Sequence, residues 1–179
     1  FPYTTLFRSA EIEAARAYIG WNHRAFEIPA DVYAAWDARA KDLPYKSPYD
    51  ALIMASIVEK ETGRDQDRAM IAAVFINRLR QGMLLQTDPS VIYGMGAKFD
   101  GNLRKRDLLA DGPYNTYTRT GLPPTPIAMP GLASLQAALH PAQSEALYFV
   151  ARGDGSSQFS RTLDEHNQAV NRYQKGGKR

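Results

Sequence analysis

Apolar residues recur at the spacing of an α-helix through most of this chain. Positions three and four apart are apolar in five stretches, and because such residues share one helix face, each stretch is predicted to form a helix. These predicted helices span residues 10–19, 31–42, 48–62, 66–81 and 131–140. Thr162 and Glu165 have the spacing of a capping box, which predicts a last helix over 163–174.

One part of the chain predicts β-structure instead. Residues 147–151 are an apolar run of strand length, 153–155 form a turn, and 158–161 are the returning strand. The chain has no internal repeat and no linker long enough to separate two full domains. The sequence therefore predicts an α+β fold, namely a mainly helical domain with a buried central helix and a small antiparallel β-hairpin.

The central helix is predicted between Ser47 and Gly63. Ser47 has the position of an N-cap, Pro48 that of the first helical residue, and Gly63 follows the helix end. Nearly every residue between them is apolar, which is typical of a buried helix. The helix nevertheless ends with two carboxylates, Glu59 and Glu61.

These two carboxylates are expected to differ in their surroundings. Glu61 lies one turn after Ile57 and Val58, on the apolar stripe, whereas Glu59 lies over smaller residues. A carboxyl group over apolar surface loses hydration, and the negative end of the helix dipole also disfavours its charge. We therefore expect Glu61 to hold its proton near neutral pH, as a general acid must.

A structural role is the alternative for both carboxylates. Arg68 and Arg78 are predicted to lie on the polar side of the helix over 66–81. An ion pair of Glu59 or Glu61 with either arginine would lower the pKa of that carboxyl and remove its proton.

A short polar segment is one candidate for the wall of a cleft beside this helix. Gln86, Thr87 and Asp88 precede a short helix predicted over 90–93, which Gly94 is expected to end. The alternative is ordinary turn chemistry, with Asp88 as the helix cap and Thr87 in support.

The segment 114–126 is a second candidate for a cleft wall. Its prolines and Gly121 exclude regular structure in its second half, while Tyr, Asn and Thr alternate in its first half. Long ordered loops of this kind are often functional. Tyrosine rings pack on the C–H faces of sugars, and amides bind sugar hydroxyl and acetamido groups. The alternative is a rigid surface strap over the core.

Composition narrows the class of protein. An apolar content of 44% and a charged content of 23% are those of an ordinary globular domain. The net charge of +3 is too small to indicate nucleic acid, and aromatic residues do not alternate with Lys and Arg as they do in single-strand binding surfaces. The basic run 104–106 is expected to be a solvated loop. No nucleic-acid partner is predicted.

Several kinds of chemistry have no residues to support them. The chain has no cysteine, so neither a disulfide nor a thiolate metal site is possible. Its three histidines are far apart without ligand spacing, and it contains no HExxH, GxSxG or Walker A motif. We expect neither a metal nor a cofactor, which leaves carboxylate chemistry.

The ends of the chain are expected to differ from its middle. Residues 1–30 are interpreted as an N-terminal remnant, of which 1–9 match nothing that follows and are interpreted as extraneous. Residues 31–175 form the predicted domain, and 176–179 a frayed tail. No apolar run approaches the length of about 20 residues that a membrane span needs.

Several segments, in the same order, resemble one known family. They are ASIVEKET (55–62), AAVFINRLRQGMLLQTDPSVIYGMG (72–96), YNTYTRTGLPP (114–124), and LYFVA with a closing HN (147–167). Together they resemble the YceG-like, or MltG-type, endolytic murein lytic transglycosylases over about residues 31–173. Members of this family also carry an N-terminal membrane helix and a LysM-like region, so the resemblance implies the catalytic domain of an anchored parent protein.

The resemblance implies a reaction on peptidoglycan. These enzymes cleave the β-1,4 bond between N-acetylmuramic acid and N-acetylglucosamine within glycan strands and leave 1,6-anhydro ends. The catalytic glutamate of the family is the second of its EKE pair, which here is Glu61, the residue that the helix-face argument also selects. The cleft wall is expected to consist of Gln86, Thr87, Asp88, Tyr93, Tyr114, Asn115 and Tyr117.

The resemblance also implies where the protein acts and with what. The partners are peptidoglycan glycan strands, and peptidoglycan synthases are a further class of partner left open. The site of action is extracytoplasmic, on the periplasmic face of the inner membrane, and contact with that membrane would come only through the missing N-terminal anchor.

Two other functions remain open. The first is a lysozyme-like hydrolase with Asp88 as a second carboxylate beside Glu61. The second is a peptidoglycan-binding module without activity, because the missing N-terminal region would otherwise help to form the cleft. The end groups of digested glycan distinguish the first from a lyase, and glycan binding without cleavage would indicate the second.

Overall fold

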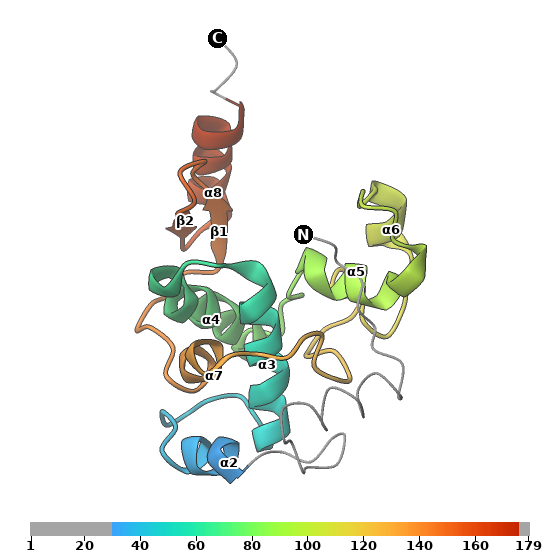
Figure 1. Ribbon diagram of the computed structural model, residues 1–179. Helices are drawn as coiled ribbons and strands as arrows, with labels where there is room; N and C mark the ends of the chain where they lie inside the picture. The colour runs from blue at the N-terminus through green and yellow to red at the C-terminus, as the bar shows by residue number, and fades with distance from the viewer. Residues whose placement is uncertain (1–29, 176–179) are drawn as a thin grey trace.

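Helix α3 (Pro48–Glu61) lies at the centre of the computed structural model, which describes residues 30–175 (Figure 1). Its start is capped as predicted: the backbone N–H of Asp50 donates to Oγ of Ser47, and Pro48 is the first helical residue. Met54, Ala55, Ser56, Ile57 and Val58 are fully buried. The prediction of a buried central helix is confirmed.

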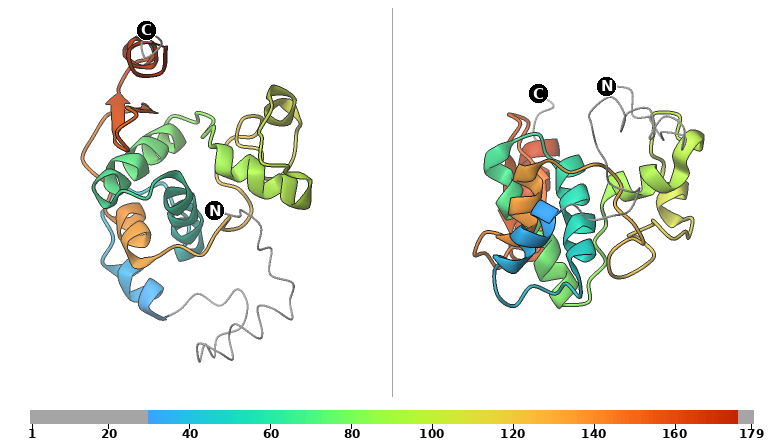
Figure 2. Two further views of the ribbon diagram at one scale, coloured as in Figure 1. Left: turned by 45° about the horizontal axis from the view of Figure 1, so that its top comes forward. Right: turned by 60° about the horizontal axis from the view of Figure 1, so that its bottom comes forward.

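Two helices pack against α3 to form the core. These are α4 (Asp65–Arg80) and α7 (Leu132–Leu139), and Figure 2 shows the three side by side. The residues 62–64 turn the chain from α3 into α4, so the two form a helical hairpin. Helix α2 (Ala30–Asp37) covers the other end of this layer, beside α3 and α7.

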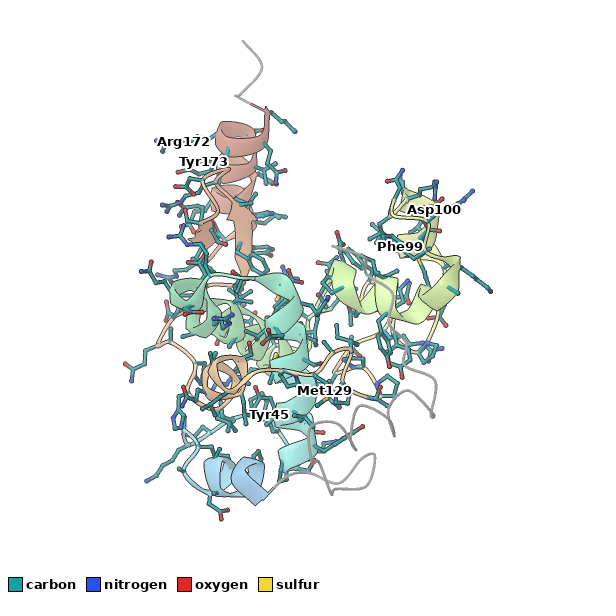
Figure 3. The ribbon with its side chains drawn as sticks, in the orientation of Figure 1. Tyr45, Phe99, Asp100, Met129, Arg172 and Tyr173 are labelled. Atoms are coloured by element: carbon teal, nitrogen blue, oxygen red, sulfur yellow. The ribbon has the colours of Figure 1, made fainter. Side chains whose placement is uncertain are left out.

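Tyr45 connects the segment before α3 to helix α7. Its hydroxyl donates to the carbonyl of Ala138 at 3.0 Å inside the protein, and burial raises its pKa. Figure 3 places the ring between α2 and the central helices. The ring of Trp36, in α2, lies 6.5 Å from it. One buried tyrosine therefore helps to hold α2 against the core.

Helix ends differ from the predicted ones where tertiary contacts intervene. Helix α2 ends at Asp37 rather than at residue 42, because the backbone N–H of Ala40 already bonds to Leu139 in α7. Helix α4 begins at Asp65 rather than at residue 66. The helix predicted over 10–19 and the terminal segments 1–9 and 176–179 lie outside the described residues.

An arm of short helices leaves the core after α4. It consists of α5 (Asp88–Met95), the 3-10 helix η1 (Gly96–Lys98) and α6 (Lys105–Leu109). Helix α5 does not end at Gly94, as predicted, but at Met95, followed by Gly96 with a φ of 53°. Gly94 instead permits close packing, since a Cβ there would lie 3.0 Å from Cβ of Tyr114.

The C-terminal part forms a separate small unit. Strands β1 (Tyr148–Ala151) and β2 (Ser157–Ser160) pair antiparallel, with Phe149 opposite Phe159, as the hairpin prediction required. Helix α8 (Leu163–Val170) begins with the predicted capping box and continues as the π-helix η2 (Asn171–Lys175). Phe149 packs edge-on against Phe75 of α4. This unit is thereby fixed to the core.

The arrangement is the predicted α+β fold, mainly helical with one small antiparallel sheet. The C-terminal unit and the arm of α5 and α6 both extend from the core toward the end of α3 at which Glu61 lies (Figure 1). The two extensions therefore flank the end of the helix that carries the candidate acid.

Within residues 30–175, no helix has both the length and the apolar character needed to cross a membrane.

Candidate active site

Glu61 is the last residue of α3, and its side chain is partly buried. The hydroxyl group of Thr87 donates a short hydrogen bond to Oε1 of Glu61. The pKa of Glu61 is raised to about 7, chiefly by burial and to a smaller extent by the negative charge of Asp88, while the Thr87 hydrogen bond and the charge of Arg78 act in the opposite direction. A substantial fraction of Glu61 is therefore protonated near neutral pH.

Glu59, two residues before Glu61, has a structural role. Its Oε2 accepts hydrogen bonds from the hydroxyl of Ser134, at 2.6 Å, and from the backbone N–H of Gly131, at 3.0 Å. These donors belong to the first turn of α7, so Glu59 caps that helix from another part of the chain. The hydrogen bond from Ser134 is the main reason that the pKa of Glu59 is lowered.

The alternative of a structural ion pair finds no support among residues 30–175. Arg68 pairs with Asp65 in the first turn of its own helix. No ion pair between those residues joins Glu59 or Glu61 to an arginine. Arg78 affects the pKa of Glu61 only through its charge. Glu61 is therefore held by a neutral donor, which leaves its proton in place.

The sequence predicted Arg78 on a polar face, but in the structure it is buried, with 8% of its surface exposed. Its Nε donates to the carbonyl of Leu147 at 2.7 Å, and its Nη1 to those of Leu85 and Leu84 at 2.9 and 3.2 Å. Burial lowers its pKa. The guanidinium connects α4 to the segment before α5 and to the start of the C-terminal unit. Its many carbonyl partners explain why a buried arginine is tolerated there.

The backbone at Gln86 directs Thr87 toward Glu61. Gln86 has a φ of 53°, in the left-handed region that is rare for residues other than glycine. This conformation is held from two sides: the backbone N–H of Gln86 donates to the carbonyl of Thr116, and its Oε1 accepts from Arg78. Thr87 is buried as a result, with its hydroxyl at Glu61.

A buried network of hydroxyl groups supports Thr87. The backbone N–H of Thr87 donates to Oγ1 of Thr116 at 3.0 Å, and Oγ of Ser90 lies 2.9 Å from the same atom and donates to the carbonyl of Thr87. The sequence interpretation missed Ser90 and Thr116 as individual residues. The only signal was the alternation of polar residues in the segment that contains Thr116, which does not say which side chain points inward.

Asp88 and Tyr117 form the outer part of the same cluster. Asp88 is exposed at the first position of α5, and the hydroxyl of Tyr117 donates a short hydrogen bond to its Oδ1. Burial and this bond raise the pKa of Tyr117, so the phenol stays neutral. Asp88 is not the N-cap expected from the sequence; that position belongs to Thr87, which makes no side-chain cap bond.

Three further predicted residues hold the long loop rather than contact Glu61 in the structure. The rings of Tyr93 and Tyr114 pack edge-on at 4.8 Å, and the hydroxyl of Tyr114 lies 2.9 Å from that of Thr125. Asn115 is buried, and its amide donates to the carbonyls of Ala110, Leu108 and Asp107. Substrate contact by Tyr93, Tyr114 and Asn115 stays a prediction.

Other parts of the described structure offer less chemistry. Among residues 30–175 no three His, Cys, Asp or Glu side chains come together where they could hold a metal ion. His166 stacks on Tyr148 in the C-terminal unit. An open depression of about 390 Å³ lies between β2, α8 and η2, and neither Glu61 nor its neighbours line it. The cluster around Glu61 is therefore the candidate active site.

Comparison with known proteins assigns a family. A model of the YceG-like family matches residues 14–172 of the chain. The chain belongs to the YceG-like family. In three dimensions it is similar to the crystal structure of a putative YceG-like protein from Listeria monocytogenes, with a TM-score of 0.67 and 39% sequence identity, over 89% of this chain and 46% of that one.

Two relatives of this YceG-like chain carry the name endolytic murein transglycosylase. The protein of that name from Bacillus subtilis is 50% identical over 127 residues, which are 71% of this chain and 35% of the relative. The one from Streptococcus pneumoniae serotype 2 is 35% identical over 127 residues, or 68% of this chain and 23% of the relative. The chain thus spans about a quarter to a third of the length of these relatives.

A second similarity is local. Transketolase 1 of Vibrio vulnificus is 53% identical over 49 residues, which are 25% of this chain and 7% of that protein. A match of this length assigns no activity to the YceG-like chain.

Proposed function

We propose that this YceG-like chain, in its described residues, is the catalytic domain of an endolytic murein transglycosylase. It cleaves the β-1,4 bond between N-acetylmuramic acid and N-acetylglucosamine within peptidoglycan strands and leaves 1,6-anhydro-muramic ends. The family and the names of two relatives support the substrate class. The observation that carries the proposal is the partly buried carboxyl group of Glu61, with a pKa of about 7, at the junction of the core and its two extensions.

Glu61 acts first as an acid and then as a base. Its proton passes to the glycosidic oxygen as the bond from that oxygen to the anomeric carbon breaks, and the N-acetylglucosamine side leaves with a free 4-hydroxyl group. The 6-hydroxyl oxygen of the muramic residue then bonds to its own anomeric carbon, and its proton returns to the Glu61 carboxylate. No water is consumed, and one protein carboxylate is sufficient because the substrate supplies the nucleophile.

Thr87 orients the acid for this step. Because its hydroxyl occupies Oε1 of Glu61, the proton is left on Oε2. A fixed carboxyl group loses little entropy on the way to the transition state, which is a large part of what an enzyme contributes. Thr87 in turn is held by buried contacts with Thr116 and Ser90.

The proposal also covers the place of action. Murein lies outside the cytoplasmic membrane, so the domain acts extracytoplasmically, and we propose that its parent protein is anchored in that membrane. Glycan strands are the proposed partners, with Gln86, Thr87, Asp88 and Tyr117 at the cleft wall nearest to Glu61. Peptidoglycan synthases are the further class of partner proposed for the parent protein.

Mass spectrometry of glycan strands tests the reaction. Purified strands are incubated with the wild-type chain, with Glu61→Gln and with Glu59→Gln, which alters the neighbouring carboxylate that caps α7. We expect 1,6-anhydro ends from the wild type and from Glu59→Gln, and none from Glu61→Gln. Reducing muramic ends would instead indicate a hydrolase, with Asp88 as its second carboxylate.

Glycan binding is measured on the same proteins. Glu61→Gln should bind strands nearly as well as the wild type, because the change removes a proton donor and keeps the shape of the side chain. A wild-type domain that binds strands and never cleaves them would contradict the proposed activity and favour a binding module.

A further inference from the structure

We propose that Asp88, fixed by Tyr117, is a positioning residue that keeps the proton on Glu61 until the glycosidic oxygen takes it. This inference rests on the proposed function, since it gives Asp88 a task in the acid step. In this arrangement Asp88 neither attacks the sugar nor activates a water molecule. Its effect on the proton-transfer step is exerted only through Glu61.

Asp88 is linked to the acid through its neighbour in sequence and is held by a residue of the long loop. Asp88 directly follows Thr87, whose hydroxyl is bound to Oε1 of Glu61. The hydroxyl of Tyr117, from the long loop, donates to Oδ1 of Asp88. The two carboxyl groups therefore flank one threonine, and each is fixed by a hydroxyl donor.

The two carboxyl groups lie at opposite kinds of helix end and differ in their exposure. Asp88 is exposed at the N-terminus of α5, where the helix dipole favours a negative charge. Glu61 is partly buried at the C-terminus of α3, where the dipole disfavours one. When two carboxyl groups lie in such unequal environments, one can serve as the charged group and the other as the group that carries the proton.

The charge of Asp88 is not neutralised by its partner. Tyr117 is a neutral donor, and no ion pair among residues 30–175 involves Asp88. The groups that face Glu61 are Arg78 from α4, Thr87 and Asp88 from the start of α5, and Tyr117 from the loop. Arg78 favours the charged form of Glu61, and Asp88 opposes it. Without Asp88, no neighbouring negative charge among the described residues would oppose the effect of Arg78 on the pKa of Glu61.

Asp88→Asn tests this assignment because it removes the charge and keeps an acceptor for Tyr117. The titration of the Glu61 carboxyl group is followed by carbon NMR, and cleavage of glycan strands is measured over the same pH range. We expect the pKa of Glu61 to fall by about 0.5 to 1, and the alkaline limb of the pH–rate profile to move to lower pH by the same amount. A residue with only a structural role would not move this limb.

Asp100→Asn is the matched control. It removes one negative charge at the outer end of the α5–α6 arm (Figure 3), where Asp100 pairs with Arg104. Glu61 should titrate as in the wild type. Tyr117→Phe is the second variant, in case Asp88→Asn fails to fold: it leaves Asp88 unfixed and more hydrated, so the pKa of Glu61 should fall, by less than in Asp88→Asn.

The two proposals fail in different ways. If the wild type forms no anhydro ends, the proposed function is wrong, while the NMR titration still measures the effect of Asp88 on Glu61. If the wild type is active and Glu61 titrates at the same pH in the wild type and in folded Asp88→Asn, or in folded Tyr117→Phe where Asp88→Asn does not fold, the role of Asp88 is overturned.

Discussion

The hydroxyl group of Thr87 donates a hydrogen bond to Oε1 of Glu61, a residue 26 positions earlier in the chain. This contact joins the end of the central helix to the start of the α5–α6 arm. It also lowers the pKa of Glu61, while burial raises it. The hydrogen bond from Thr87 therefore has two opposite effects on the acid: it holds the carboxyl group in one orientation, and it makes the proton easier to lose.

Replacing Thr87 should separate orientation from protonation. In Thr87→Val the donor is lost with little change of shape, so we expect cleavage to slow by about 10-fold to 100-fold. The pKa of Glu61 should rise, and the alkaline limb of the pH–rate profile should move to higher pH. Thr87→Ser keeps the donor and serves as the control. Equal rates for the valine and serine variants would show that the hydrogen bond has no part in catalysis.

Glu61 should make the folded domain less stable as the pH rises. Its pKa is about 7 in the folded protein and 4.5 as the unperturbed value, so the folded state binds more protons between these values. The stabilisation is complete below pH 4.5, and the free energy of unfolding falls as the pH rises through 7. Glu61→Gln removes this dependence.

We expect Glu61→Gln to be more stable than the wild type by about 2 kcal/mol at alkaline pH, a value reduced for the partial exposure of the side chain. The advantage should vanish at acid pH, where Glu61 is protonated in both states. Urea denaturation of both proteins at several pH values measures the difference. A wild-type advantage at alkaline pH would mean that the charged Glu61 is stabilised in the folded protein.

Glu59 should affect stability and not catalysis. Glu59→Ala removes the acceptor for Ser134 and for the backbone of Gly131 at the start of α7. The loss of a helix cap costs about 1 to 2 kcal/mol. Thermal unfolding should show this loss, while the folded variant should cleave glycan at the wild-type rate. A strong loss of activity in folded Glu59→Ala would contradict the assignment of the general acid to Glu61.

Asn115 should control the order of the long loop. Its side-chain amide donates to three backbone carbonyls and its Oδ1 accepts from the N–H of Tyr117. Asn115→Ala leaves these partly buried groups without partners, at a cost of about 2 kcal/mol. Hydrogen exchange should increase in residues 110–118. Because Tyr117 would lose its position, the effect of Asp88 on Glu61 should weaken too.

Asp111→Asn is the control for Asn115→Ala. Asp111 bonds to Arg119 and Thr118 at the exposed side of the same loop. This surface contact contributes little to stability. Unchanged hydrogen exchange in Asn115→Ala would show that other contacts hold the loop.

Much of the fold could be predicted because it depends on neighbours in sequence. The capping of α3 by Ser47 and the capping box of α8 need residues three positions apart, and the hairpin needs a turn between two short apolar runs. The position of Glu61 on an apolar stripe also follows from the helical repeat. Helix ends were less predictable: a bond to α7 follows the early end of α2, and α5 continues past Gly94, which packs against Tyr114 instead of ending the helix.

The sequence by itself determined which residue is the candidate acid and that it stands at the end of a buried helix. The tertiary structure alone decided its partners. Thr87 reaches Glu61 across 26 residues, Tyr117 reaches Asp88 across 29, and Arg78 turns inward to carbonyls up to 69 residues away. The local sequence pattern determines the helix face on which a side chain lies, but tertiary packing determines which residues contact that face. The protonation of Glu61 depends on both.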